Sequence, residues 1–222
     1  MPILPQGLRS LAPARLRDDP RLRGAGVGLG LIPPRRMHSE DDMRILLDAA
    51  RQAERVVEIG VYEGASALAL CEALGPRCEL HLIDPFGAHP DALPRGWGAS
   101  EWATRRVLER AVRCPGRQAP AVRWHVALSH EVAARWSGSV GLVFIDGDHS
   151  REGCELDWTS WSRFVAPGGH VVFHDARAGE PNGRGLPGPS AVVRDHFRGE
   201  RTAAGWVIAA EADRTVAVRR VA

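Results

Sequence analysis

The chain has 222 residues, of which 44% are hydrophobic and 25% charged, and its formal net charge at pH 7 is +2. This composition is typical of a globular protein of one or two domains. The small net charge, without a basic stripe interleaved with aromatic residues, argues against a nucleic-acid partner. No stretch resembles a signal peptide or approaches the roughly 20 apolar residues of a membrane span, so we expect a cytoplasmic protein without a membrane-spanning segment.

Cysteine and lysine content excludes two further kinds of site. The four cysteines, Cys71, Cys78, Cys114 and Cys154, form no C-x-x-C pair, which argues against a zinc ribbon or a thioredoxin-type site. The chain contains no lysine, so a catalytic base has to be sought among histidines and carboxylates.

The first 38 residues are rich in arginine, proline and glycine and have the character of a leader that covers another part of the molecule. Residues 24–30 are glycine-rich, and Pro33-Pro34 then blocks a helix. Ser39, followed by three acidic residues, is typical of a helix N-terminus. We therefore predict a leader or lid at 1–38, a helix from Ser39 to about Gln52, and a single domain at 39–222.

From residue 55 onward, β-branched and helical segments alternate. The strand at 142–146 is almost wholly apolar, which suits a central parallel strand covered on both faces. The alternation predicts a Rossmann-like α/β fold with a mostly parallel sheet and helices on both faces, and the last two strands predict an antiparallel C-terminal hairpin at its edge. We predict strands at 55–59, 79–84, 122–126, 142–146, 169–175, 205–210 and 215–219, and helices at 65–74, 100–113, 129–136, 152–164 and 190–197.

The loop after the first strand is a candidate cofactor site. In open α/β sheets ligands bind beyond the carboxyl ends of the strands, and glycines there allow the backbone to approach a ligand at a helix N-terminus. The loop lacks the G-x-G-x-x-G pattern, which counts against a pyrophosphate cofactor such as NAD. A plain strand–helix turn would look similar. The candidate cofactor-binding residues of this segment are Glu58, Gly60, Tyr62, Gly64 and Ser66.

Asp84 ends the second strand, 24 residues beyond Gly60. An acid at this place can accept hydrogen bonds from ribose hydroxyls, although a turn or capping aspartate is the simpler alternative. Ser129, after the third strand, is expected to cap the following helix and is also a candidate for contact with an adenine. Together these residues indicate an adenosine-containing ligand without a pyrophosphate, and S-adenosylmethionine fits that description.

Acidic and imidazole side chains gather after two later strands. Asp146, Asp148 and His149 follow the apolar strand, and His174 and Asp175 end the next one. Because parallel neighbours end at the same edge of a sheet, these side chains should converge at its mouth. A buried apolar strand does not itself require such a cluster, so we expect it to be functional.

Four short motifs lie within residues 56–176, and the last two are fairly specific in combination. They are Glu58-x-Gly60-x-x-x-Gly64, Ile83-Asp84-Pro85-Phe86, Phe144-Ile145-Asp146-Gly147-Asp148-His149, and Pro167-Gly168-Gly169 with His174-Asp175. Together they resemble the class I S-adenosylmethionine-dependent methyltransferases, and among them the macrocin-type sugar O-methyltransferases and related polysaccharide enzymes. The resemblance implies a sugar or oligosaccharide acceptor, with a methylated mannose oligosaccharide as one candidate, and Asp146 among the residues near the cofactor.

A looser similarity, in spacing, is to catechol O-methyltransferase, whose metal site takes an acid at the fourth strand and two residues 28 and 29 positions later; here these are Asp146, His174 and Asp175. The resemblance implies a Mg²⁺ or Mn²⁺ site on these residues, whose imidazole and carboxylates suit divalent ions. His149 stands at the position of that enzyme's catalytic base, and an unperturbed imidazole titrates near neutral pH. His174 is the alternative base, in which case it would not bind the metal.

The walls of the acceptor site are the least defined part of the prediction. Trp97, Trp102, Trp158 and Trp161 could stack on a sugar, although tryptophans more often lie in a core. The loop at 177–189, rich in glycine and proline, directly follows the strand with the metal ligands and is a candidate for a mobile wall.

Three other functions stay open. They are an O-methyltransferase of a non-sugar secondary metabolite, an adenosine-ligand-binding module without catalysis, and a metal-dependent hydrolase. The binding module would not depend on Asp146 or Asp175, and the hydrolase would bind metal but no methyl donor. A homodimer is compatible with the sequence, and Asp157, in the helix after His149, is expected to face solvent.

Overall fold

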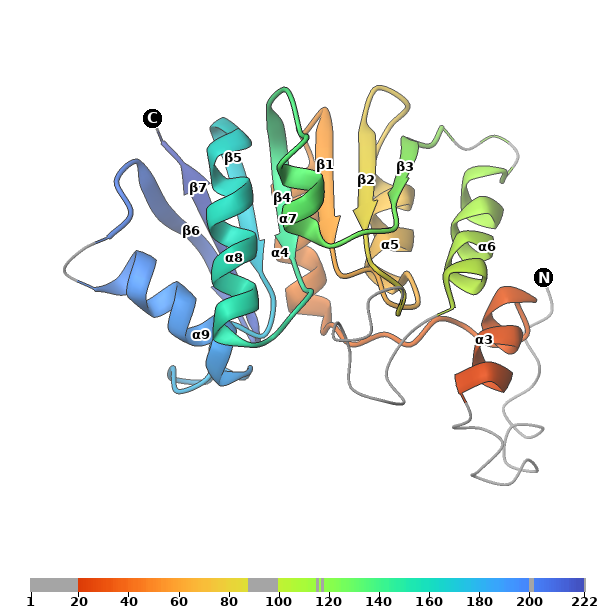
Figure 1. Ribbon diagram of the computed structural model, residues 1–222, viewed down its shortest axis with the longest axis horizontal. Coiled ribbons are helices and arrows are strands. Elements are labelled where there is room, and N and C mark those ends of the chain that lie inside the picture. The colour runs from red at the N-terminus through yellow and green to blue at the C-terminus, as the bar shows by residue number, and fades with distance from the viewer. Residues whose placement is uncertain (1–19, 88–99, 115, 117, 200–201, 222) are drawn as a thin grey trace.

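Seven strands of the described chain form one sheet in the order β3-β2-β1-β4-β5-β7-β6. The computed structural model (Figure 1) describes residues 20–87, 100–114, 116, 118–199 and 202–221, so Trp97 and the first half of the predicted leader lie outside the described residues. The strands are β1 (Arg55–Ile59), β2 (Glu79–Ile83), β3 (Ala121–His125), β4 (Val140–Ile145), β5 (Val165–Phe173), β6 (Trp206–Ala212) and β7 (Thr215–Arg220).

The first five strands are parallel, and β7 pairs antiparallel with both β5 and β6. The predicted Rossmann-like fold is therefore confirmed. The predicted C-terminal hairpin lies at the edge of the sheet, with β7 beside β5 and β6 outermost. Strand order reverses between β1 and β4, which is the place where open α/β sheets bind their ligands.

Helices cover both faces of the sheet, because alternate side chains of a strand point to opposite sides. In β4, Leu142 and Phe144 pack toward α4, α5 and α6, whereas Val143 and Ile145 pack toward α7, α8 and α9. Burial on both sides explains why this strand is apolar throughout. The helices are α4 (Glu40–Ala50), α5 (Ala65–Ala73), α6 (Glu101–Val112), α7 (Ser129–Ala133), α8 (Arg151–Trp161) and α9 (Pro187–Val193).

Most strand and helix boundaries agree with the prediction within a few residues, and the start of β5 is the largest difference among the strands. The strand begins at Val165 instead of residue 169 because an irregularity between Val140 and Leu142 lets Val165 pair with Val140. The sequence Pro167-Gly168-Gly169 suggests a turn, yet it lies within the strand. None of the described helices is long and apolar enough to cross a membrane.

The described part of the leader contains a helix that the sequence did not predict, α3 (Pro20–Gly28). It packs on α6, where Val27 is buried with Ala103 and Val107. Arg110 of α6 donates to the carbonyl oxygens at the end of α3, which satisfies groups that a helix C-terminus leaves without partners. The chain then runs beneath the carboxyl ends of the strands to α4, as Figure 1 shows.

Candidate active site

The loop between β1 and α5 has an unusual backbone. Gly60, Tyr62 and Gly64 have φ angles of 86°, 52° and 83°, a region that favours glycine. A Cβ at Gly60 would collide with the backbone of Asp146, so this glycine also allows the ends of β1 and β4 to lie against each other. The loop is thus shaped by its glycines, as the sequence indicates.

Asp84 holds this loop in place. Its Oδ2 accepts the backbone N–H groups of Val61 and Tyr62, each at 2.8 Å, and its Oδ1 accepts that of Phe86 at 2.8 Å. Burial raises the pKa of the carboxyl, and these three bonds oppose the shift. Asp84, the residue predicted to bind a ribose, therefore also orders the loop between β1 and α5, which we call the cofactor loop after its predicted role. A carboxylate can accept about four hydrogen bonds in all, so these three leave some capacity for a ligand.

Glu58, at the end of β1, is wholly buried. Ser66 donates its hydroxyl to Oε1 of this carboxyl at 2.5 Å, whereas Oε2 has no hydrogen-bond partner among the described residues. Burial, reinforced by the charges of Asp146 and Asp84, raises the pKa of Glu58 to about 8. A buried carboxyl oxygen without a partner is costly, so this atom is suited to a polar ligand group.

Two expectations about the region after β3 were wrong. Ser129 does not cap α7, whose N-cap is Leu128; its hydroxyl donates instead to Asp157 Oδ1. Asp157 does not face solvent but is 5% exposed, and burial raises its pKa to about 7. Helix α8 turns this residue inward, toward Gly147 at the end of β4.

The predicted cluster of carboxylates and histidines assembles without Asp148, whose Oδ1 accepts the backbone N–H of Ser150. Asp146 Oδ1 lies 2.9 Å from His174 Nδ1 and 3.3 Å from His149 Nε2. Asp175 Oδ2 lies 3.7 Å from His174 Nδ1 and 3.5 Å from His149 Nε2. Donor atoms of His149, His174 and Asp175 lie within 4.8 Å of one another, and so do those of His38, Asp146 and His174. His174 therefore belongs to two possible sets of metal ligands at the mouth of the sheet.

The charges in this cluster are strongly coupled. Burial by itself would raise the pKa of Asp146, but the charge of His174 and hydrogen bonds with three histidines hold it well below its usual range. Burial would lower the pKa of His174, yet Asp146, Asp42 and Asp175 raise it to about 10. The bond to Asp146 raises the pKa of His149. The neighbouring carboxylates therefore favour the charged form of His174.

Asp175 and the β6–β7 hairpin complete the cluster from the other side. Asp175 has a φ of 51°, a conformation that is uncommon outside glycine but tolerated by aspartate. Arg214, in the hairpin turn, lies 3.1 Å from its Oδ1. One oxygen of Asp175 is therefore paired with an arginine and the other faces the histidines.

The sequence analysis missed two members of the cluster, His38 and Asp42. His38 Nε2 lies 3.0 Å from Asp146 Oδ2, and its ring centroid lies 4.4 Å from that of His174. Asp42 is 1% exposed and its Oδ2 lies 3.8 Å from His174 Nε2. Asp42 also forms the capping box of α4 with Ser39. An acidic residue in the first turn of a helix is explained by that local role, so nothing in the sequence indicated that Asp42 belongs to the cluster.

The described leader is fixed to the cofactor loop at Glu63. Arg23 donates to both oxygens of this carboxylate, at 2.5 and 2.6 Å, and the backbone N–H of Arg35 donates at 2.5 Å. The Arg35 side chain also reaches the hydroxyl of Tyr62. Bidentate arginine–carboxylate pairs are strong and directional, so the leader is held beside the loop.

The tryptophans described do not line a sugar site as expected. Trp158 and Trp161 are buried in the core between the sheet and α8. Trp102 is 51% exposed, but it lies on α6 against Gly28 of α3. Trp158 and Trp161 therefore follow the alternative that tryptophans more often lie in a core.

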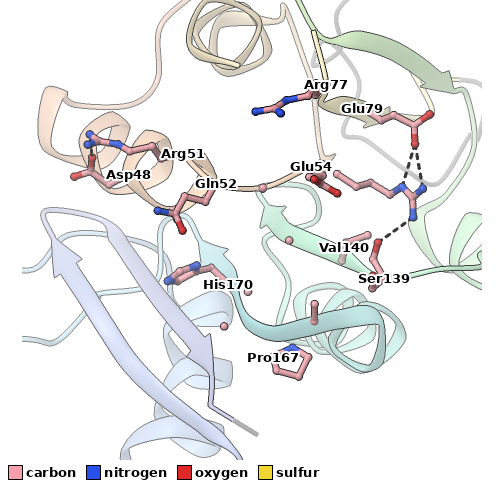
Figure 2. A pocket seen from close by; sticks show the side chains of 17 residues that line it. Asp48, Arg51, Gln52, Glu54, Arg77, Glu79, Ser139, Val140, Pro167 and His170 are labelled. Atoms are coloured by element: carbon pink, nitrogen blue, oxygen red, sulfur yellow. Dashed lines mark hydrogen bonds and ion pairs between the residues drawn. The ribbon is translucent and has the colours of Figure 1, made fainter. Parts of the chain in front are cut away.

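An open hollow of about 750 Å³ lies at the opposite, amino end of the sheet. Figure 2 shows its polar wall, where Arg55 pairs with Glu79 and donates to the carbonyl oxygen of Ser139. Arg51 and Asp48 form another ion pair, and both side chains are more than half exposed. The buried titratable groups converge at the other end of the sheet.

Comparison with known proteins identifies the family. Residues 57–176, just over half of the chain, match a family model described as a methyltransferase domain. This chain belongs to that methyltransferase family. The match begins within β1 and extends beyond the end of β5, so it contains the carboxylate–histidine cluster except His38 and Asp42.

Solved structures share the fold at low identity. The O-methyltransferase NovP has a TM-score of 0.61 at 17% identity, over 90% of this chain and 89% of its own. TomG, an O-methyltransferase from Streptomyces achromogenes involved in tomaymycin synthesis and solved with SAM, scores 0.58 at 18% identity, over 97% and 95%. Cofactor-bound Rv0187 from MTB scores 0.59 at 19% identity, over 99% and 98%.

Proposed function

We propose that this methyltransferase transfers the methyl group of S-adenosylmethionine to a hydroxyl of a sugar or oligosaccharide, assisted by a divalent metal ion. The observation that carries the proposal is the convergence of Asp146, His149, His174 and Asp175 beside a glycine loop. Family membership supports methyl transfer in general. The sugar acceptor rests on the motif resemblance, and a non-sugar metabolite is the alternative.

The donor site has two features that fit S-adenosylmethionine. Gly60 and Gly64, both with positive φ, shape the loop that leads into the N-terminus of α5, and the unpartnered Oε2 of Glu58 offers a buried carboxylate to an ammonium group. A cation beside Glu58 would favour its ionised form. Glu58, Gly60, Tyr62, Gly64, Ser66 and Asp84 are the proposed donor-site residues, with Ser129 acting near the adenine through its bond to Asp157.

The metal site is proposed on Asp146, His174 and Asp175. His174 Nδ1 lies 2.9 Å from Asp146 Oδ1 and 3.7 Å from Asp175 Oδ2, and ligands bound at about 2.1 Å around one ion lie roughly 3 Å from each other. Carboxylate oxygens suit Mg²⁺ and Mn²⁺, and the imidazole makes Mn²⁺ the better match. A divalent ion lowers the pKa of a bound hydroxyl, which is the chemistry it would supply.

His149 is the proposed general base. Its Nε2–H can donate to Asp146, which leaves Nδ1 with a lone pair on a side chain that is 36% exposed. The acceptor oxygen would bond to the methyl carbon as the carbon–sulfur bond breaks, and the hydroxyl proton would pass to Nδ1. Asp146 would orient the ring and stabilise its charged form, as carboxylates do for catalytic histidines.

Calorimetry with S-adenosylhomocysteine, with and without Mn²⁺, tests this proposal against its alternatives. We expect the nucleoside to bind in both conditions, and chelation to abolish methyl transfer to sugar acceptors while nucleoside binding persists. Binding without any methyl transfer would indicate a non-catalytic module, and full transfer in excess chelator would remove the metal. Metal binding without nucleoside binding would favour a hydrolase. Activity only on non-sugar hydroxyl compounds would correct the acceptor alone.

A further inference from the structure

The leader contributes a histidine to the centre of the proposed site. His38 immediately precedes Ser39, the N-cap of α4, and its side chain is 6% exposed. No member of the predicted site came from this part of the chain. His38 is thus buried against Asp146, a carboxylate 108 residues away in the chain, and the proposed function gives it no role.

The two oxygens of Asp146 are used by different partners. Oδ1 faces His174 Nδ1 and His149 Nε2 at 2.9 and 3.3 Å, whereas Oδ2 faces His38 Nε2 at 3.0 Å. A carboxylate bound through only one oxygen can rotate about its Cβ–Cγ bond. A donor on Oδ2 removes that freedom and keeps Oδ1 directed at the other histidines.

The surroundings of His38 support a donor role for Nε2. Its Nδ1 is buried and has no partner among the described residues, and an imidazolium would bury a second N–H there. A neutral ring with its hydrogen on Nε2 pairs that hydrogen with Asp146 and leaves only an acceptor atom unsatisfied. Phe144 and His174 flank the ring, with centroids 5.7 and 4.4 Å away, so the ring is packed in place.

We propose that His38 is a positioning residue for the metal centre: it donates Nε2–H to Asp146 Oδ2 and thereby aims Oδ1 at the ion. This inference rests on the proposed metal-assisted function. Residues in this outer position typically change metal affinity or activity by 10–100-fold. The Arg23–Glu63 and Arg35–Glu63 bonds hold the leader beside the cofactor loop, so the centre depends on a segment outside the matched family region.

The test is Mn²⁺ affinity measured by calorimetry on the full chain, alongside S-adenosylhomocysteine affinity and thermal unfolding. We expect His38→Ala to weaken Mn²⁺ binding by roughly 10–100-fold with unchanged nucleoside affinity. His38→Gln, whose amide can place an N–H near the position of Nε2, should recover most of the lost affinity. Met37→Ala, the neighbouring and 45% exposed leader residue, should match the wild type.

Three results would overturn the positioning role. The first is unchanged Mn²⁺ affinity in His38→Ala, and the second is equal weakening in the alanine and glutamine variants. The third is a parallel loss of nucleoside affinity, because the leader as a whole would then have moved. If the wild type itself binds no Mn²⁺, the metal-assisted function fails and this inference fails with it. That outcome is distinct because it appears before any substitution is made.

Discussion

The two ends of the sheet differ in what they offer a ligand. The amino end has a broad hollow whose charged side chains pair with each other in solvent. The carboxyl end has buried carboxyls and imidazoles from separate segments that point at one another. The two ends of the sheet therefore differ in chemistry, and the buried, mutually perturbed groups at the carboxyl end are the better guide to function.

Acidic residues at the two ends show the same contrast. At the carboxyl end, burial raises the pKa of Glu58 to about 8 and that of Asp157 to about 7. At the amino end, the hydrogen bond from Arg55 lowers the pKa of Glu79. Burial therefore raises the pKa of Glu58 and Asp157, whereas an ion pair at the surface lowers that of Glu79. The following predictions use that difference.

The largest effect is expected at His149. If it accepts the hydroxyl proton, His149→Ala should lower turnover by roughly 10²–10⁴-fold, while donor affinity stays almost unchanged because the loss falls on the transition state. Steady-state kinetics and calorimetry measure the two quantities. His174→Ala is the control and should raise the metal requirement. If instead His174→Ala abolishes turnover without a metal effect and His149→Ala retains it, the two histidine roles are reversed.

The pH profile of the wild type offers a second view of the same group. The base must be neutral. The bond to Asp146 raises the pKa of His149, and a divalent ion on Asp146 would oppose this shift. Turnover should fall as pH decreases through the pKa of the imidazole in the metal-loaded enzyme, with full activity on the alkaline side. A profile of kcat/KM for the metal-loaded enzyme measures this. A flat profile down to pH of about 5 would exclude His149 as the base.

Asp84→Ala should weaken S-adenosylhomocysteine binding by roughly 1–3 kcal/mol, as expected for the loss of a charged acceptor. The carboxylate holds two N–H groups of the cofactor loop, so part of the loss will come from loop order. Asp84→Asn keeps one acceptor oxygen and should fall between the alanine variant and the wild type. Calorimetry on the folded variants measures their affinity for S-adenosylhomocysteine. Unchanged affinity in the alanine variant would mean that the ribose is bound by other residues.

Asp157→Asn should change the pH dependence of stability. The unfolded carboxyl ionises near 3.8 and the folded one near 7, so the wild type loses stability as pH rises between these values and the loss is complete above 7. Asparagine does not ionise. The variant should therefore gain roughly 2–3 kcal/mol relative to the wild type between pH 5 and 8. Denaturant unfolding measures it; a pH-independent difference would mean that Asp157 is ionised in the fold.

The strands and helices from α4 onward could be predicted from the sequence, because glycines, helix caps and apolar strands act locally. The sequence also located Asp146, His149, His174 and Asp175, since strand order brings consecutive strand ends to one edge. His38 could not be found in this way, because it lies 108 residues from Asp146 and belongs to no strand. Asp157 was assigned to solvent because the sequence does not state how far α8 is rotated about its axis.

Arg55→Ala, at the amino end, should have the smallest effect. Arg55 lies 3.1 Å from Glu79 with both side chains about one third exposed, and such surface pairs contribute about 0–1 kcal/mol. Turnover and donor affinity should equal those of the wild type. The stability difference should be present at pH 7 and vanish as pH falls through the lowered pKa of Glu79, because a protonated carboxyl no longer attracts the guanidinium. Denaturant unfolding and kinetics measure both. A large loss of turnover would mean that the hollow takes part in catalysis, and the contrast between the two ends of the sheet would then fail.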